Sequence, residues 1–390
     1  MDLSVFFQPI NFSEYIQELP QSAIGKLIQI FDNPNQFPNC EGVQLALIGV
    51  KEGRQSINNH ACANGPDVIR KKLYALYQGD FNLKMVDLGN IKAGYEIKDT
   101  YFALTSVVEQ LIKNNIIPIV IGGGQDLTYP MYRAYEKLEQ IINLVAIDPR
   151  FDFNSELSEI NSQSYLDKII LHQPCYLFNY SNIGYQTYLV DQSTLNLLQK
   201  LFFDAYRLGW VRSNIEEVEP IVRNADMLSV DISAIRFADA PATAFTSPNG
   251  FNGEDVCQMM RYAGLSEKLS SIGIFEYNPQ LDTHEQTAYL IAEMIWCFID
   301  GFYSRKHDLP SPNSSSHVKY RVSLENNKYE IVFYKSNKTD RWWMDVPYPN
   351  QSPKSKYERH HLVPCSYNDY QLACNEEMPD KWWQTFQKLI

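Results

Sequence analysis

The sequence predicts an α/β protein with three layers, in which a mostly parallel sheet lies between two layers of helices. Two observations predict this class. Short, nearly continuous apolar runs at 43–50, 116–121 and 142–147 are typical of strands that are buried on both faces. Amphipathic helical segments separate these runs, and strands that alternate with helices favour parallel pairing with helices on both faces of the sheet.

The segments between and after these three runs continue the alternation. A helix over 67–77 follows the first run, and Pro66 fits its first turn, where a missing N–H group costs little. A long helix over 284–304 closes the series. The other predicted strands are 83–88, 204–208, 227–230 and 271–275, and the other predicted helices are 101–113, 127–138, 216–223 and 254–268.

The chain divides into three parts on these patterns. Residues 1–42 form a polar lead-in with short helices and loops, residues 43–307 form the α/β domain, and residues 308–390 form a linker and an extension. A Pro/Ser-rich linker at 308–316 is followed by an alternating pattern over 319–334 that predicts a β-hairpin. The extension also carries two Trp-Trp pairs, at 342–343 and 382–383. They form either a small packed core or a surface for a protein partner.

Composition and charge narrow the class of partner. The chain has 390 residues with 34 Lys and Arg against 46 Asp and Glu, a net charge of −12, which disfavours nucleic acid and anionic membranes. Seven cysteines without a C-x-x-C pair argue against a zinc ribbon and for reduced thiols in the cytoplasm. The first residues do not resemble a signal peptide, and the most apolar helical stretch is too short and too charged to span a membrane.

Polar clusters follow four of the predicted strands. They are Gly122–Asp126 (GGGQD), Asp148–Asp152 (DPRFD), Asp231–Ser233 (DIS) and Glu276. In parallel α/β sheets the chemistry lies at the carboxyl ends of the strands, so we expect these clusters to converge. Converging buried carboxylates repel one another unless a cation, a basic side chain or a raised pKa relieves them, and a hard divalent cation is one natural solution.

Six motifs occur in order over about 43–305: GPDVIRKKL, VIGGGQD, AIDPRFD, LSVDISAIRFADAPAT, GIFEYNPQLD and TAYLIAEMI. In these motifs the sequence resembles the arginase/agmatinase/formimidoylglutamase family of ureohydrolases, and formimidoylglutamases in particular. The resemblance implies an arginase-like α/β/α fold. It also implies a two-manganese site that makes a hydroxide, which attacks a guanidinium or amidine carbon. Family members commonly form trimers or hexamers, so a homo-oligomer is a further expectation.

The resemblance places three of the six family metal ligands in this sequence, at Asp148, Asp152 and Asp231. The first family histidine is replaced by Gln125, so one metal position keeps four oxygen-bearing side chains. Such a set favours one divalent cation of the Mn, Mg or Ca kind over zinc. The alternative is a relic cluster without metal, in which Gln125 is an ordinary hydrogen-bonded loop amide.

The second metal position has lost two of its four ligands. The resemblance places Arg150 where the family has a histidine and Ser233 where it has an aspartate. A guanidinium has no lone pair for a metal and is always charged, so we do not expect a dinuclear manganese centre. We expect Arg150 to point inward, like Asp148, and to form an ion pair with the acidic cluster, since residues two apart on a strand face the same way.

Two further residues are candidate ligand-binding positions. Glu276 matches the family glutamate of the last strand-end motif and suits a small cationic ligand, with an ion pair to Arg150 as the alternative. Asn182 lies in a polar segment, 182–186, where the family builds substrate contacts; loop scaffolding explains this segment equally well.

Two hypotheses of function follow. The first is a formimidoylglutamase-like pseudoenzyme with a degraded dinuclear site, which acts by binding a small ligand or, through its extension, a protein partner. The second is an active hydrolase of C–N bonds in a linear amidine or guanidine that uses one metal, with Arg150 as an electrostatic surrogate for the other. No catalytic residue is assigned, and substrate turnover distinguishes the two hypotheses.

Overall fold

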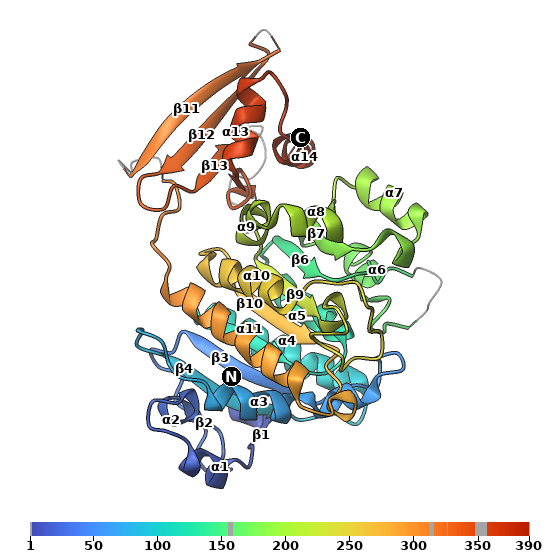
Figure 1. The fold of residues 1–390 in the computed structure, drawn as a ribbon, viewed down its shortest axis with the longest axis vertical. Coiled ribbons are helices and arrows are strands. Elements are labelled where there is room, and N and C mark those ends of the chain that lie inside the picture. Colours follow the sequence, from blue (N-terminus) through green and yellow to red (C-terminus); the bar gives the residue numbers. More distant parts are fainter. Residues whose placement is uncertain (1, 155–158, 312–315, 326, 348–356, 390) are drawn as a thin grey trace.

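One sheet of ten strands forms the centre of the molecule (Figure 1). The computed structural model describes residues 2–154, 159–311, 316–325, 327–347 and 357–389. The strands of the central sheet are β1 (Phe7–Gln8), β2 (Gln29–Ile30), β3 (Leu45–Val50), β4 (Met85–Ile91), β5 (Ile117–Ile121), β6 (Ile142–Ile147), β7 (Leu177–Tyr185), β8 (Asp204–Arg207), β9 (Met227–Asp231) and β10 (Ser271–Phe275). They lie in the order β1-β4-β3-β5-β10-β9-β6-β7-β8, with β2 also paired to β4.

All pairings in this sheet are parallel except that of β1 with β4. The helices of this part are α1 (Ser13–Glu18), α2 (Ile24–Leu27), α3 (Gly65–Ala75), α4 (Ile97–Lys113), α5 (Thr128–Lys137), α6 (Tyr165–Ile170), α7 (Gln192–Lys200), α8 (Leu208–Ser213), α9 (Val218–Arg223), α10 (Gly253–Leu265) and α11 (Gln286–Tyr303). The three-layer fold with a mostly parallel sheet is therefore confirmed.

Two apolar cores lie on the two faces of the sheet. One face packs against α3, α8, α9, α10 and α11, and the other packs against α4, α5, α6 and α7. Strand β5 shows why its sequence is continuously apolar. Ile119 and Ile121 enter the first core, while Val120 enters the second, so every position of the strand loses contact with water.

Three strands of the sheet lie outside the predicted set. The lead-in contributes β1 and β2, each only two residues long, which extend the sheet beside β4. Strand β7 is buried over its whole length although it carries polar residues. The side chains of Asn179 and Ser181 bond to each other and to Asp204 of the neighbouring strand, which satisfies their polar groups inside the protein.

The extension forms a separate four-stranded antiparallel sheet with two helices. The elements are β11 (His317–Leu324), β12 (Tyr329–Ser336), β13 (Trp342–Asp345), β14 (Leu362–Cys365), α13 (Tyr367–Cys374) and α14 (Asp380–Leu389). Strands β11 and β12 form the expected hairpin. Trp342, Trp343 and Trp382 are buried and Trp383 is 38% exposed. Trp342 and Trp382 belong to the core of this unit, whereas Trp343 packs against Arg223 of the α/β domain.

The C-terminal unit, residues 316–389, packs against the α/β domain at β7 and α9. The ring of Phe178 on β7 stacks on His360 at a centroid distance of 4.1 Å. Arg359 donates to the buried carboxylate of Asp226 at 2.6 Å. None of the helices in the described part of the chain combines the length and apolar character needed to cross a membrane.

A fully buried ion pair connects α3 to β4. The Nε of Arg70 lies 2.7 Å from Oδ2 of Asp87, and both side chains are inaccessible to solvent. Asn90 and the carbonyl of Gly89 accept the remaining Arg70 donors, and Tyr74 donates to Asp87. The pair is thus satisfied on all sides, as a buried charge must be.

We expect Arg70→Met to lower the free energy of unfolding by about 3–5 kcal/mol, because it leaves the buried Asp87 carboxylate without its counter-charge. Urea denaturation measures this difference. The control is Arg261→Met, which removes a half-exposed arginine from its pair with Asp300 and should cost less than about 1 kcal/mol. Equal losses of stability in the two variants would contradict the conclusion that Arg70 neutralises the buried Asp87 carboxylate.

Candidate metal centre

Four neighbouring strands bring the predicted polar clusters together. In the sheet, β5, β10, β9 and β6 are consecutive and parallel, so their carboxyl ends share one edge. Gln125 follows β5, Glu276 follows β10, Asp231 ends β9, and Asp148 follows β6. All four side chains are buried at that edge, which is the position where parallel α/β sheets place their chemistry.

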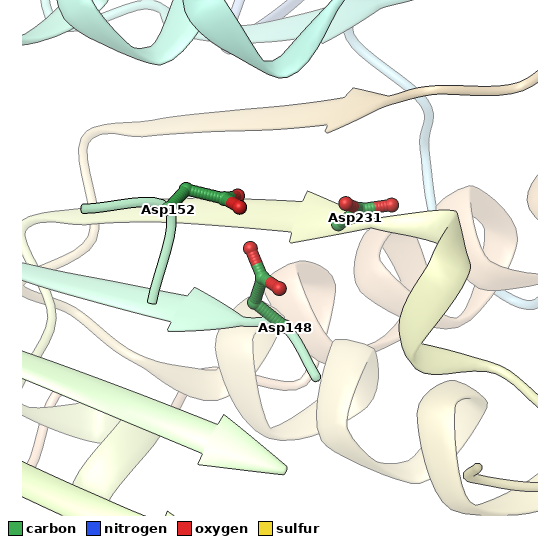
Figure 2. Close-up of side chains that lie close together, drawn as sticks. All are labelled: Asp148, Asp152 and Asp231. Atoms are coloured by element: carbon green, nitrogen blue, oxygen red, sulfur yellow. The ribbon is translucent and has the colours of Figure 1, made fainter. Parts of the chain in front are cut away.

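Three aspartates form the centre of this cluster. One carboxylate oxygen from each of Asp148, Asp152 and Asp231 lies within 4.8 Å of the other two. Figure 2 shows Asp148 and Asp152, from the loop after β6, close to Asp231 at the end of β9. Their exposed fractions are 1%, 7% and 7%. Three acidic oxygens at this spacing suit a divalent cation with oxygen ligands.

Burial and mutual repulsion disfavour the charged form of these groups. Burial raises the pKa of Asp148, and burial together with the charge of Asp148 raises the pKa values of Asp152 and Asp231 well above the usual range. Backbone N–H groups bond two of the aspartates, since Arg150 N donates to Asp148 and Ser233 N donates to Asp231. Side-chain hydrogen bonds also join Asp148 to Asp152 and to Gln125, and Asp231 to Ser233. Oδ2 of Asp148 is buried without a hydrogen-bond partner. A bound cation would relieve both the repulsion and this unpaired oxygen.

Gln125 lies beside Asp148 and is inaccessible to solvent. Its Nε2 donates to the hydroxyl of Tyr165 at 3.2 Å, while its Oε1 is buried and has no hydrogen-bond partner. An orphaned buried amide oxygen is rare in proteins and requires an explanation. A cation held by the three aspartates would supply one, because amide oxygens are good ligands for hard divalent ions.

Arg150 does not form the expected ion pair with the acidic cluster. Its guanidinium lies over the ring of Phe245 at 5.2 Å, and within the described residues no carboxylate lies within 4 Å of it. The predicted ion pair is therefore absent among the described residues, although the charge of Arg150 lowers the pKa values of Asp148 and Asp152. Strand β6 ends at Ile147, so the alternation that assigned Asp148 and Arg150 to one face does not extend to residue 150.

Ser233 and Arg150 stand at two of the four ligand positions that the family resemblance assigns to the second metal. Ser233 is 1% exposed, and its hydroxyl lies beside Asp231. A neutral hydroxyl offers no charge to a metal, and a guanidinium offers no lone pair. The residues present thus keep four oxygen-bearing side chains for one divalent cation and two of the four family ligands for the other.

Glu276 is held by neutral donors rather than by a basic side chain. Ser56 Oγ and Asn59 Nδ2 donate to its Oε2 at 2.6 and 2.8 Å, and the backbone N–H of Gln125 donates to its Oε1 at 2.9 Å. Burial raises its pKa, and these hydrogen bonds oppose that effect. Arg150 is not its partner, so the alternative role of Glu276 as the counter-charge of Arg150 is also wrong.

Two of the acidic residues adopt left-handed backbone conformations, which is uncommon for residues other than glycine. Asp152 has φ +48° and Glu276 has φ +68°. Gly123 precedes Gln125 with φ +79°, and a Cβ there would lie 2.5 Å from the carbonyl oxygen of Glu52. Backbone strain of this kind concentrates at functional sites, where it directs side chains to a common point.

Asn182 lies in the interior of β7 and has no exposed surface. Its Nδ2 donates to the carbonyl of Arg150 at 2.8 Å, so it fixes the backbone of the loop that carries Asp148 and Asp152. A separate open pocket of about 190 Å³ adjoins the centre, and its lining includes Arg150 and Asp152. Of the three aspartates of the triad, Asp152 reaches the lining of this pocket.

Asp126 is a buried acid to which sequence reasoning assigned no role. It accepts a hydrogen bond from the Tyr101 hydroxyl at 2.6 Å, and burial raises its pKa to about 7. The charges of Glu276 and Glu52 add to the shift. Its position directly after Gln125 in the GGGQD cluster was the only available signal.

Because the folded pKa of Asp126 lies above its usual value of 3.8, the folded state binds this proton more tightly, and stability falls as pH rises from about 4 to 7. We expect Asp126→Asn to remove about 3 kcal/mol of that loss between pH 5 and pH 8. Denaturant titrations at pH 5 and pH 8 measure it, with Asp80→Asn on an exposed loop as control. An unchanged pH dependence in Asp126→Asn would contradict this assignment.

The fold and the centre together define an α/β protein with a buried acidic cluster at adjoining strand ends. The chain belongs to the arginase family, whose model matches residues 43–300. The resemblance found in the sequence motifs is therefore confirmed, and the C-terminal unit lies outside the matched region.

Similar proteins agree with this assignment. A formimidoylglutamase of Staphylococcus aureus is 26% identical over 305 residues, covering 75% of this chain and 92% of the relative. The crystal structure of Trypanosoma cruzi formiminoglutamase with Mn2+2 superposes with a TM-score of 0.66 at 18% identity, covering 73% of this chain and 99% of that one. Agmatine ureohydrolase of Thermoplasma volcanium gives a TM-score of 0.59 at 21% identity, covering 74% and 97%. The structural matches establish a shared fold.

Proposed function

We propose that this protein binds one divalent cation at Asp148, Asp152 and Asp231, with the Gln125 amide oxygen as a fourth ligand. The observation that carries the proposal is the convergence of three buried carboxylates within 4.8 Å, with no basic side chain of the described residues in an ion pair within 4 Å of them. An all-oxygen set favours Mg, Ca or Mn. The orphaned oxygens of Asp148 and Gln125 support the same conclusion.

In this proposal the protein does not carry out the two-metal hydrolysis associated with its relatives and acts instead by binding a small ligand. Support comes from Arg150 and Ser233, which provide neither charge nor lone pairs suited to a second cation. The open pocket of about 190 Å³ beside Asp152 has the guanidinium of Arg150 in its wall. A ligand there would meet the cation through one part and Arg150 through another.

The second candidate is a single-metal hydrolase of a linear amidine such as formimidoylglutamate. Glu276 favours it: this buried carboxyl is oriented by three donors from two loops, close to Gln125, and suits a cationic amidinium. A divalent cation bound at the aspartates would lower the pKa of a water molecule. Glu276 would hold the amidinium in place, and no described basic residue would compete for it.

Elemental mass spectrometry on protein loaded with Mn²⁺ and then dialysed tests the cation site. We expect one manganese ion per chain. Two ions per chain would contradict the loss of the second position, and an absence of bound metal, at equilibrium with millimolar Mn²⁺, would contradict the cation site itself.

Release of ammonia or formamide from formimidoylglutamate by the manganese-loaded protein separates the two candidates. The binding proposal expects no release above that of Asp231→Asn, which lacks one of the three carboxylates. Release that depends on both Asp231 and Glu276 would establish the single-metal hydrolase instead.

A further inference from the structure

A second cavity lies where the C-terminal unit meets the α/β domain. Its volume is about 180 Å³. The lining comes from the end of α9, the segment after α10, the linker, β13 and β14, so it shares no residue with the metal centre. The cavity exists only because the extension packs there, since eight of its twelve lining residues lie beyond residue 300.

Four basic side chains line this cavity: Arg223, Lys268, Arg341 and Arg359. The exposed fractions of the first three are 5%, 15% and 13%, and that of Arg359 is 49%. Three buried cations around one small space are unusual, because each loses hydration that only counter-charges or a ligand replace.

The counter-charges lie mostly behind the wall. Glu219 accepts from Arg223 at 2.9 Å and is 3.2 Å from Arg341, and Asp226 is 2.6 Å from Arg359 and 3.7 Å from Lys268. Each of these two acids is therefore shared between two cations. The acids in the lining itself are Glu267, Asp308 and Glu358.

The four cations meet five carboxylates, two behind the wall and three in the lining, so the cavity carries no excess of positive charge, but the hydrogen-bond pairing is incomplete at one atom. Burial lowers the pKa values of Lys268 and Arg341, and the charges of Asp226 and Glu219, respectively, oppose this effect. The guanidinium of Arg223 packs over the ring of Trp343 at 4.3 Å, and its Nη1 is buried without a hydrogen-bond partner. A buried guanidinium nitrogen without an acceptor is costly, and an anion is the partner it lacks.

We propose that this cavity binds a small carboxylate with an apolar body, the size of an aliphatic amino acid. The carboxylate head would lie among Arg223, Lys268 and Arg359, since guanidinium groups recognise planar carboxylates with paired hydrogen bonds. The body would lie against the apolar part of the wall, which consists of Leu265, Leu309, Trp343, Leu362 and Pro364. Glu267 and Glu358 in the lining suit an α-ammonium group in addition.

Two matched probes test the chemistry on the full chain: 4-methylpentanoate, and 4-methylpentan-1-ol, which has the same body without the charge. Isothermal titration calorimetry should show binding of the acid at least about tenfold tighter than that of the alcohol, because only the acid engages the cations. L-Leucine then shows whether an ammonium group strengthens binding. Failure of the acid to bind up to about 10 mM, or equal binding of acid and alcohol, would overturn the proposal.

Two variants test whether 4-methylpentanoate binds in this cavity. Arg359→Gln removes a half-exposed cation, and Leu309→Trp fills the space while keeping every charge; Leu309 is 58% exposed and tolerates a larger side chain. Each should weaken binding of 4-methylpentanoate at least about tenfold. Arg321→Gln, which removes an exposed arginine elsewhere on the same unit, should leave the affinity unchanged within about twofold. Retention of wild-type affinity in either cavity variant would overturn the proposal.

Discussion

The combined substitutions Gln125→His, Arg150→His and Ser233→Asp are expected to raise the manganese content from one to two ions per chain. The three changes restore the residues that the family resemblance places at the metal positions, next to the retained Asp148 and Asp231. Two imidazoles and a fourth carboxylate supply the lone pairs and the charge that the wild-type residues do not supply. Elemental mass spectrometry after dialysis gives the stoichiometry.

The control for this prediction is Gln125→His alone, which alters only the retained position and should keep one ion per chain. The backbone N–H of Arg150 already donates to Asp148 at 2.7 Å, so residue 150 lies close enough for a histidine to reach the centre once the stacking on Phe245 is lost. A triple variant that still binds a single ion would show that residues 150 and 233 do not face the second position.

Asp231→Asn is expected to weaken Mn²⁺ binding at least about 100-fold, because it removes one of three charged ligands. The same substitution should stabilise the cation-free protein at pH 7. Burial and the charge of Asp148 raise the pKa of Asp231 far above its usual value, so in the folded state its charged form is unfavourable. Calorimetric titration measures the affinity, and urea denaturation in chelator measures the stability.

Weaker Mn²⁺ binding together with higher stability of the cation-free protein distinguishes a metal ligand from an ordinary core residue. The matched control is Asp167→Asn, which changes another buried aspartate, on α6 and outside the triad, and should leave Mn²⁺ affinity unchanged within about twofold. If Asp231→Asn lowered both the Mn²⁺ affinity and the stability, the loss of affinity would follow from damage to the fold. It would then not identify Asp231 as a metal ligand.

The strands that the sequence predicts most clearly are those with the same apolar environment on both faces. Strands β3, β5 and β6 are apolar at almost every position because both of their faces pack against helices. Strand β7 is buried as deeply but carries Asn179, Ser181 and Asn182, whose polar groups bond inside the protein. Its sequence therefore resembles a loop. The two-residue strands β1 and β2 are too short for any periodic pattern to reveal them.

The site divides in the same way. The strand order brings the ends of β5, β10, β9 and β6 together, as the strand-end rule leads one to expect. The rule does not predict the side-chain contacts of the residues that follow the last paired residue of each strand. Arg150 turns to Phe245, and Glu276 takes donors from Ser56 and Asn59, more than 200 residues earlier in the chain. Such contacts depend on loop conformations that a single sequence does not encode in any repeating pattern.

Because the extension packs against the family region, the two parts form one structural unit. The family match ends at residue 300, yet Phe178 and Asp226 of the matched part are completed by His360 and Arg359 from the far end of the chain. A gene fragment that encoded the family region alone would translate into a protein with an uncovered ring on β7 and a buried acid short of a cation. An exchange of this region alone with that of a relative would uncover the same ring and the same acid, so we expect a stable chimera to require both parts together.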